Sequence, residues 1–264
     1  MTTDQASNNK PASEAITEPQ DRTVVFHYHL FKNAGTSLDA ALREAFGDDA
    51  WAEREFRGPI SANQKATAEW IETHPEIQCF SSHTSVLPCA DIPGVTVFPV
   101  ILLRHPIDRI ASAYTFEAQQ NAGTFGSTLA RNTTLAGYIE TRLSMPGDHQ
   151  CSEFHAYRLA EGRPASEGSL HDRALQVLEQ LPFIGIVEEY GRSLSILESA
   201  LTDAGFENVA LQNQQKNVSK GRKRLLDDKL QKIRSEIGDE LFDRLIEANR
   251  TDLELHTQAT MALT

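Results

Sequence analysis

The sequence lacks long hydrophobic runs, contains little cysteine and has no excess of positive charge. No apolar stretch approaches the roughly 20 residues that a membrane-spanning helix requires, so we expect no membrane span. The three cysteines in 264 residues do not resemble a disulfide framework, which favours a reducing, cytoplasmic location. A formal net charge of −12 argues against nucleic acid as a partner, so any anion site has to be built locally.

The composition that remains is ordinary for a globular protein with a core, with 40% hydrophobic and 23% charged residues. Residues 1–22 are polar, carry both signs of charge and contain no apolar segment. We expect them to form a disordered tail and not a secretion signal. Residues 23–264 are expected to form a single domain.

Strand-like runs alternate with segments of helical periodicity along this domain. The expected strands are 23–30, 77–82, 95–103 and 183–187. The expected helices are 37–46, 62–74, 107–120, 135–143, 153–160, 170–181, 190–204, 225–237 and 239–257. The run 95–103 is apolar almost throughout, as in a central parallel strand, and should begin just after Pro99. The alternation predicts an α/β fold with a parallel sheet covered by helices on both faces.

A loop of small residues follows the first expected strand. Its chemistry-bearing members are Lys32, Asn33, Ala34, Gly35, Thr36 and Ser37. Backbone N–H groups, two hydroxyls and the start of the next helix could together bind an anion, with Lys32 adding a full charge. The order of residues differs from the nucleotide-triphosphate P-loop, because the lysine precedes the glycine. An ordinary strand-to-helix turn is the alternative.

A second motif joins the run 95–103 to the next expected helix. Arg104 should lie at the carboxyl end of the strand, where its fork of donors could grip a phosphate. Ser112 lies about two turns into the helix and could reach the same anion. Alternatively, Arg104 pairs with a nearby carboxylate.

Together the two motifs resemble the pair that binds 3′-phosphoadenosine-5′-phosphosulfate (PAPS) in sulfotransferases. The family pattern is matched at Lys32, Gly35, Thr36, Ser37, Arg104, Pro106, Arg109 and Ser112. It is not matched at Phe31, Asn33, Ala34 and His105, and none of these differences removes a charged ligand. The resemblance implies the sulfotransferase fold, with a P-loop-like parallel sheet.

Four further segments are similar to the carbohydrate sulfotransferases that include heparan sulfate 2-O-sulfotransferase. They occur in the family's order and comprise 80–85, which contains His83, and 183–188, 217–220 and 249–252. The resemblance therefore covers about 23–256 and implies transfer of a sulfuryl group from PAPS to a hydroxyl of a saccharide or glycoconjugate, without a metal.

The resemblance also implies a role for each motif. Lys32 would donate to the leaving oxygen, while Gly35, Thr36 and Ser37 would bind the 5′-phosphate, with Asn33 and Ala34 in the same cofactor-binding loop. Arg104 and Ser112 would bind the 3′-phosphate. Asn217, Ser219 and Lys220 would form a flap over the nucleotide, and the solvated start of a helix is the alternative for this basic segment.

The acceptor hydroxyl needs a base, and the resemblance points to His83. A hydrogen-bonded structural histidine is the alternative for this residue. Its rivals as the base are His27, His29, His105, Glu53 and Glu55. The irregular stretch 121–168 is the expected acceptor-binding region.

Two other functions stay open from the sequence. One is a kinase-like phosphoryl transferase, for which the loop lacks the Lys-Ser/Thr magnesium pair. The other is a protein that binds adenosine 3′,5′-bisphosphate (PAP) or an anionic sugar without catalysis.

Overall fold

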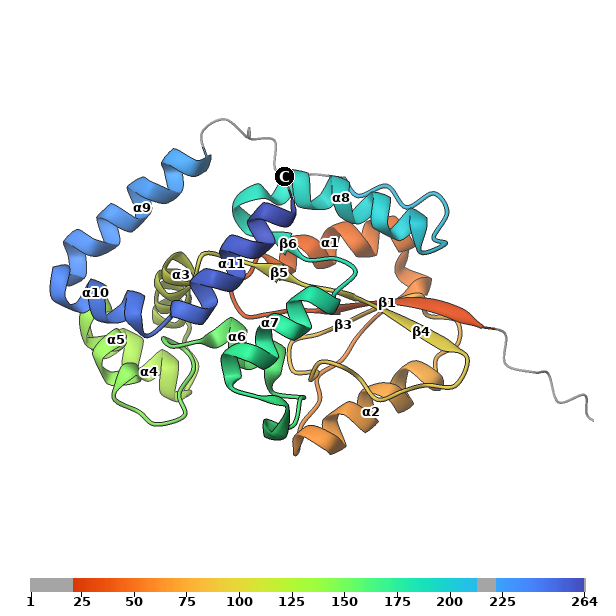
Figure 1. Ribbon diagram of the computed structural model, residues 1–264, viewed down its shortest axis with the longest axis horizontal. Helices are drawn as coiled ribbons and strands as arrows, with labels where there is room; N and C mark the ends of the chain where they lie inside the picture. The colour runs from red at the N-terminus through yellow and green to blue at the C-terminus, as the bar shows by residue number, and fades with distance from the viewer. Residues whose placement is uncertain (1–20, 213–221, 264) are drawn as a thin grey trace, which may run out of the picture.

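The computed structural model describes residues 21–212 and 222–263, with a four-stranded parallel sheet at its centre (Figure 1). The strand order is β2-β3-β1-β4, and a second, two-stranded parallel sheet pairs β5 with β6. The strands are β1 (Arg22–Tyr28), β2 (Trp51–Glu53), β3 (Cys79–Ser82), β4 (Val95–Val100), β5 (Leu102–Leu103) and β6 (Gly185–Ile186).

Helices cover both faces of the sheet because β1 buries side chains on both sides. Val24 and Phe26 pack in one hydrophobic cluster, and Val25 packs in another on the opposite face. The first cluster is covered by α2 (Ile60–Glu72), α6 (Phe154–Ala160), α7 (Leu170–Gln180) and α11 (Arg250–Ala262). The second is covered by α1 (Gly35–Phe46) and α8 (Tyr190–Asp203). The predicted α/β class, with a parallel sheet between helices, is confirmed.

A third cluster lies beside the sheet and is built mainly from helices, with Cys151 of the segment before α6 packed among them (Figure 1). It comprises α3 (Pro106–Gln119), α4 (Phe125–Asn132), α5 (Leu135–Leu143), α9 (Arg222–Ile237) and α10 (Asp239–Glu247). Short 3₁₀ turns occupy Asp48–Ala50, Ala165–Glu167 and Val187–Glu189. Over the described part of the chain, every helix is too short or too polar to cross a bilayer.

The expected single strand 95–103 is wrong, because the chain changes sheets within it. β4 is an edge strand whose neighbour in the sheet is β1, and β5 pairs with β6 in the second sheet. Pro99 lies inside β4, opposite Phe26, and does not precede the strand. An edge strand tolerates proline because one side of its backbone needs no partner.

The expected helix 239–257 is also wrong, since two helices occupy this stretch. α10 ends at Glu247 and α11 starts at Arg250. Between them Asn249 turns its side-chain amide onto the carbonyls of Leu245 and Cys151, each at 2.8 Å, and so competes with helix continuation.

The stretch 121–168 is less irregular than expected. It contains α4, α5 and α6, of which the first was not predicted. Thr124 and Thr134 cap α4 and α5 through their side-chain oxygens. Most of the expected tail, and Asn217, Ser219 and Lys220, lie outside the described residues.

Candidate functional site

A cavity of about 560 Å³ opens where the carboxyl ends of β1, β3 and β5 meet α3 and α9. Ligands of parallel α/β sheets bind at this edge. Its volume lies within the range of roughly 300–1,000 Å³ for small-molecule pockets. Both motifs of the sequence reach this cavity, although about 70 residues separate them.

Five members of the first motif line the cavity: Lys32, Ala34, Gly35, Thr36 and Ser37. The loop turns sharply because Lys32 and Ala34 have left-handed backbone angles, with φ of 64° and 58°. The Ala34 carbonyl accepts the N–H groups of Ser37 and Leu38. No acceptor within the described residues is bonded to the N–H of Gly35 or Thr36, so both remain available to an anion at the start of α1.

Lys32 is the cation of this loop. Its Nζ lies 4.1 Å from the centre of the Phe116 ring, an arrangement in which the ring face attracts the charge. Burial lowers the pKa of Lys32, and the neighbouring positive charge of Arg104 lowers it further.

Asn33 does not line the cavity. Its side chain is buried and hydrogen-bonds Nε2 of His155, at 3.0 Å from Nδ2. The two left-handed residues beside it turn Asn33 inward. Its expected contact with an anion stays a prediction.

Gly35 has a steric role beside His29. A Cβ on Gly35 would lie 2.0 Å from Cδ2 of His29, so any larger residue displaces the ring. The glycine is required here for close approach to an imidazole rather than for an unusual φ angle.

Arg104 and Ser112, from the second motif, also line the cavity. Arg104 Nε donates to Asp108 Oδ2 at 2.8 Å, and Nη2 lies 2.7 Å from the same oxygen. Nη1 donates to the Lys32 carbonyl at 3.1 Å, which joins the two motifs directly. A guanidinium has five N–H donors, so one on each terminal nitrogen is left for a ligand. Arg104 therefore pairs with a carboxylate, as one alternative from the sequence expected, and it also faces the cavity. Its contact with a phosphate stays a prediction.

Arg109 matches the same family pattern but is fully buried. It donates to the backbone carbonyl and side chain of Gln150 and lies 4.1 Å over the Phe154 ring. In this chain it ties α3 to the segment that enters α6.

His83 lines the cavity from the segment after β3. Its ring packs against that of His29 in a tilted arrangement, with centroids 3.7 Å apart, and its Nε2 lies 3.9 Å from Oε1 of Glu53. Glu55 accepts the backbone N–H of His83 at 3.2 Å. Three of the expected base candidates therefore surround His83.

Asp39 connects His27 and His29 next to the cavity. Its two carboxylate oxygens each lie 2.6 Å from an Nδ1, one of His27 and one of His29, and Ser81 Oγ donates at 2.7 Å. Burial alone would raise the pKa of Asp39, but the hydrogen bonds from His27 and His29 hold it well below its ordinary value.

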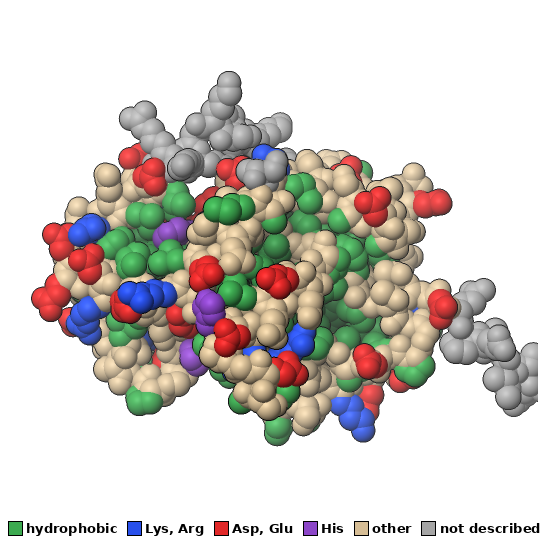
Figure 2. Space-filling view, viewed as in Figure 1, with side chains coloured by type: hydrophobic (Ala, Val, Ile, Leu, Met, Phe, Trp, Pro, Cys, Tyr) green, Lys and Arg blue, Asp and Glu red, His purple; other side chains and the backbone are tan. Residues whose placement is uncertain are grey.

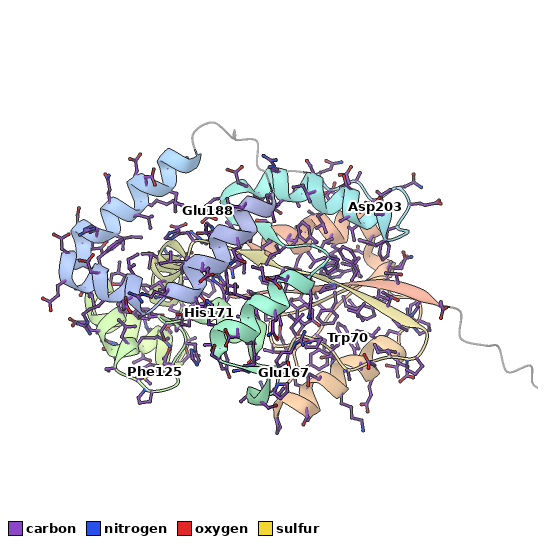
Figure 3. The ribbon with its side chains drawn as sticks, in the orientation of Figure 1. Trp70, Phe125, Glu167, His171, Glu188 and Asp203 are labelled. Atoms are coloured by element: carbon purple, nitrogen blue, oxygen red, sulfur yellow. The ribbon has the colours of Figure 1, made fainter. Side chains whose placement is uncertain are left out.

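His105, the remaining rival, does not line the cavity. It precedes α3, and its N–H donates to Glu188 Oε1 at 2.9 Å. Burial and the nearby His256 lower the pKa of His105 to about 4. Glu188, labelled in Figure 3, lines the cavity and also bonds His256 at 3.1 Å.

Several cavity residues were not predicted from the sequence, among them Asp108, Phe116, Leu226 and Lys229. Lys229 of α9 reaches Asp108 Oδ2 at 3.2 Å across 121 positions. Only Asp108 carries a local signal, because it lies one helical turn after Arg104.

The expected acceptor region lies elsewhere. Within the described residues, the cavity lining includes none from 121–168. Phe125, in this region, lies well apart from Glu188 in Figure 3. The acceptor role of 121–168 stays a prediction.

The positive charge of the cavity is local. Figure 2 shows acidic side chains scattered across one face of the molecule, consistent with the net charge of −12. Against this background the cavity gathers Lys32, Arg104 and Lys229.

In the part of the chain that the structure describes, two groups have potential metal-ligand atoms within 4.8 Å of one another: His27, His29 and Asp39, and Glu53, Glu55 and His83. In the first group each Nδ1 is already bonded to the carboxylate. His149 and His155 are close in sequence but have different partners. His149 stacks on Tyr157, and His155 faces Asn33.

Comparisons with known proteins were made by sequence and by structure. No family model matches the chain. An uncharacterized protein of Archaeoglobus fulgidus is 36% identical over 242 residues, which cover 89% of this chain and 95% of the relative. The crystal structure of a sulfotransferase from Alicyclobacillus acidocaldarius aligns over 84% of this chain and 95% of that chain, with a TM-score of 0.34 and 14% identity.

Proposed function

The chain belongs to one family with the uncharacterized Archaeoglobus fulgidus protein, and we propose from its own site that it is a PAPS-dependent sulfotransferase acting on a hydroxyl group. One observation carries the proposal. Two motifs that resemble the donor-binding pair of sulfotransferases line one cavity, and Arg104 bonds the backbone of Lys32 within it.

The donor groups of the cavity fit a nucleotide with two separate phosphate positions. The free N–H groups of Gly35 and Thr36, with the exposed hydroxyls of Thr36 and Ser37, would hold the 5′-phosphate. The two free donors of Arg104 and the hydroxyl of Ser112 would hold the 3′-phosphate. Bound PAPS supplies an activated sulfuryl group with PAP as its leaving group.

Lys32 would stabilise the negative charge that develops on the leaving oxygen. Its ammonium lies over the Phe116 ring and forms no ion pair with any residue that the structure describes, so it can move to an anion without breaking one. His83, across the cavity, would accept the proton of the attacking hydroxyl. The chain's own contribution is alignment of donor and acceptor together with charge stabilisation.

The hydroxyl would belong to a saccharide or glycoconjugate, as the resemblance to carbohydrate sulfotransferases implies. The cavity carboxylates Asp108 and Glu188 are bonded to protein cations or N–H groups, so we assign them no magnesium. The proposal therefore requires no metal, and ATP with magnesium is the natural competitor to test.

The deciding experiment is calorimetric titration of the protein with PAP in the absence of metal. We expect micromolar affinity, much weaker binding of ATP with or without magnesium, and roughly a hundredfold loss in Arg104→Ala. Arg104→Lys keeps the charge but loses the fork, so its loss should be almost as large.

Arg43→Ala is the matched control, because Arg43 forms an exposed pair with Asp48 outside the cavity. It should bind PAP like the wild type. Folded protein that binds no PAP would contradict the proposal, and tight magnesium-dependent ATP binding would favour a kinase-like function. PAP binding without transfer from PAPS to any hydroxyl acceptor would favour a non-catalytic nucleotide-binding protein.

A further inference from the structure

The proposed base, His83, lies against a buried arrangement of two histidines and one carboxylate. His29 is the member of this arrangement that lines the cavity, and Asp39 bonds its Nδ1. The proposed function does not account for them, because neither matches a sulfotransferase motif identified in the sequence.

The tautomer of His29 follows from its bond to Asp39. The low pKa of Asp39 keeps its carboxylate ionised, and an ionised carboxylate can only accept hydrogen bonds. The Nδ1 atoms of His27 and His29, each 2.6 Å from one carboxylate oxygen, must therefore carry their hydrogens. This leaves Nε2 of a neutral His29 without a hydrogen.

The orientation of His29 is fixed by three contacts in addition to that bond. Its backbone N–H donates to the Ser82 carbonyl at 2.9 Å, which places it beside the residue that follows, His83. Gly35 leaves just enough room for the ring on the loop side. The ring of His83 packs on it with centroids 3.7 Å apart and planes inclined by 36°.

We propose that Asp39 and His29 are positioning residues for His83: Asp39 holds the His29 ring through Nδ1, and the His29 ring holds the His83 ring through close, tilted packing. The negative charge of Asp39, relayed by the polarised ring of His29, also stabilises the positive charge that His83 gains during the reaction. This inference rests on the proposed function, because it assigns His83 the acceptor's proton.

The proton and electron balance is simple. The acceptor O–H bond breaks, its proton goes to a free ring nitrogen of His83, and its oxygen forms the new bond to sulfur. The bond between sulfur and the bridging oxygen breaks, and its electron pair stays on that oxygen, to which Lys32 donates. His29 keeps its Nδ1 proton through the bond to Asp39. It takes no second proton on Nε2, since two charged imidazoles in contact would repel each other.

Other charged groups also face His83 and must be separated from this effect. Glu53 of β2 lies 3.9 Å from Nε2, and Glu55 bonds the backbone N–H. Lys32 lines the same cavity with the opposite sign. Glu53 is half exposed, whereas only 15% of the Asp39 side chain is exposed, so solvent screens Glu53 more strongly.

The first test needs neither donor nor acceptor. The ring protons of His83, assigned with His83→Asn, are followed by NMR through a pH titration. Asp39→Asn keeps the shape of Asp39 but removes its charge, and should lower the titration midpoint of His83 by roughly 0.5–1 pH unit. Asp48→Asn removes an exposed charge outside the cavity lining and should leave the midpoint unchanged. Equal midpoints in Asp39→Asn and Asp48→Asn would overturn the proposal.

The second test uses turnover of PAPS with the best acceptor found. Asp39→Asn and His29→Phe should lower kcat roughly 10–100-fold with little change in the KM for PAPS, and Asp39→Asn should move the acidic limb of the pH profile downward. If His83→Asn kept the wild-type rate while His29→Phe abolished it, His29 would itself be the base and the proposal would be wrong. A protein that binds no PAP would instead refute the proposed function, and the NMR test would still report on the three residues.

Discussion

Two aspartates of this chain each meet histidine, and their surroundings differ. Asp39 on α1 bonds His27 and His29 beside the cavity, and 15% of its side chain is exposed. Asp252 on α11 lies 3.1 Å from Nδ1 of His155, and both side chains are fully buried. The residue types and the helical origin of the carboxylate are the same in both places.

The difference lies in what else each carboxylate holds. Asp252 accepts the backbone N–H groups of His155 and Ala156, at 2.9 and 2.8 Å, and so caps the start of α6. Glu153 caps α11 in the same way, because its carboxylate accepts the N–H groups of Thr251 and Asp252 at the start of that helix. Among the described residues, the Asp39 carboxylate is bonded by three side chains, two of which are imidazoles, and by no backbone N–H group.

This contrast separates a structural aspartate–histidine pair from a candidate reactive one. Burial lowers the pKa of His155, and its Nε2 faces Asn33 rather than a cavity. His29 lines the cavity. We therefore expect changes at Asp252 to act on stability and changes at Asp39 to act on catalysis.

The largest expected effect is on stability, in Asp252→Ala. This change leaves two helix-terminal N–H groups and a buried histidine without their partner, and should lower the free energy of unfolding by about 3–5 kcal/mol. Urea unfolding followed by circular dichroism measures it. PAP affinity per folded molecule should stay near the wild-type value.

Asp39→Ala is the matched comparison and should cost less, about 1–3 kcal/mol, because water can reach part of the vacated space. An Asp252→Ala protein no less stable than Asp39→Ala would show that the two networks do not differ as proposed.

The second effect concerns Gly35, which packs against His29, the partner of Asp39, and not against His155, the partner of Asp252. In Gly35→Ala the new Cβ collides with the His29 ring, so the ring or the loop has to shift. We expect a loss of about 1–3 kcal/mol in unfolding free energy and roughly tenfold weaker PAP binding. Calorimetry and urea unfolding measure the two losses.

Gly123→Ala is the control, because an added Cβ there meets no atom within 4 Å. Its stability and PAP affinity should match the wild type. Equal behaviour of the two variants would mean that the close approach of Gly35 and His29 has no consequence.

The third effect is the pH dependence of stability. Interactions with histidine and N–H groups hold the pKa values of Asp39 and Asp252 below the ordinary 3.8, despite burial. A carboxyl group with a depressed pKa contributes stability above its unfolded pKa and loses it as pH falls toward the folded pKa. The free energy of unfolding should therefore fall as the pH drops below about 4.

Asp39→Asn removes one of these groups and should make the free energy of unfolding fall less steeply. The difference in this free energy between the variant and the wild type should therefore shrink as the pH drops from about 5 to about 3. Asp48→Asn, which alters an exposed pair, should leave the slope unchanged. Parallel curves of unfolding free energy against pH for the wild type and Asp39→Asn would contradict the lowered pKa of Asp39.

The sequence predicted the parts of the cavity that depend on local order. Lys32 follows one strand and Arg104 another, and parallel strands bring their carboxyl ends to one edge of the fold. The motifs and the α/β class could be predicted for this reason. The split of 95–103 between two sheets could not, because both halves are equally apolar and only backbone pairing separates them.

The rest of the site depends on packing between distant segments. Asp39 is one polar residue on an amphipathic helix until β1 and β3 place His27 and Ser81 against it. Lys229 reaches Asp108 only because α9 packs beside α3. The inward turn of Asn33 follows from left-handed angles that its neighbours adopt under tertiary constraint.

The smallest effect tests that left-handed turn directly. Ala34 has φ of 58°, a conformation that is strained for alanine and free of strain for glycine. Ala34→Gly should therefore raise the free energy of unfolding by about 0.5–1 kcal/mol, after the larger entropy of an unfolded chain with glycine is subtracted. The same substitution at the exposed, helical Ala40 should instead lower it by about 1 kcal/mol. Urea unfolding of the two variants then gives changes of opposite sign, because only Ala34 lies in the left-handed turn beside the cavity. A loss of stability in both would show that alanine is relaxed at position 34 and that the loop stores no strain there.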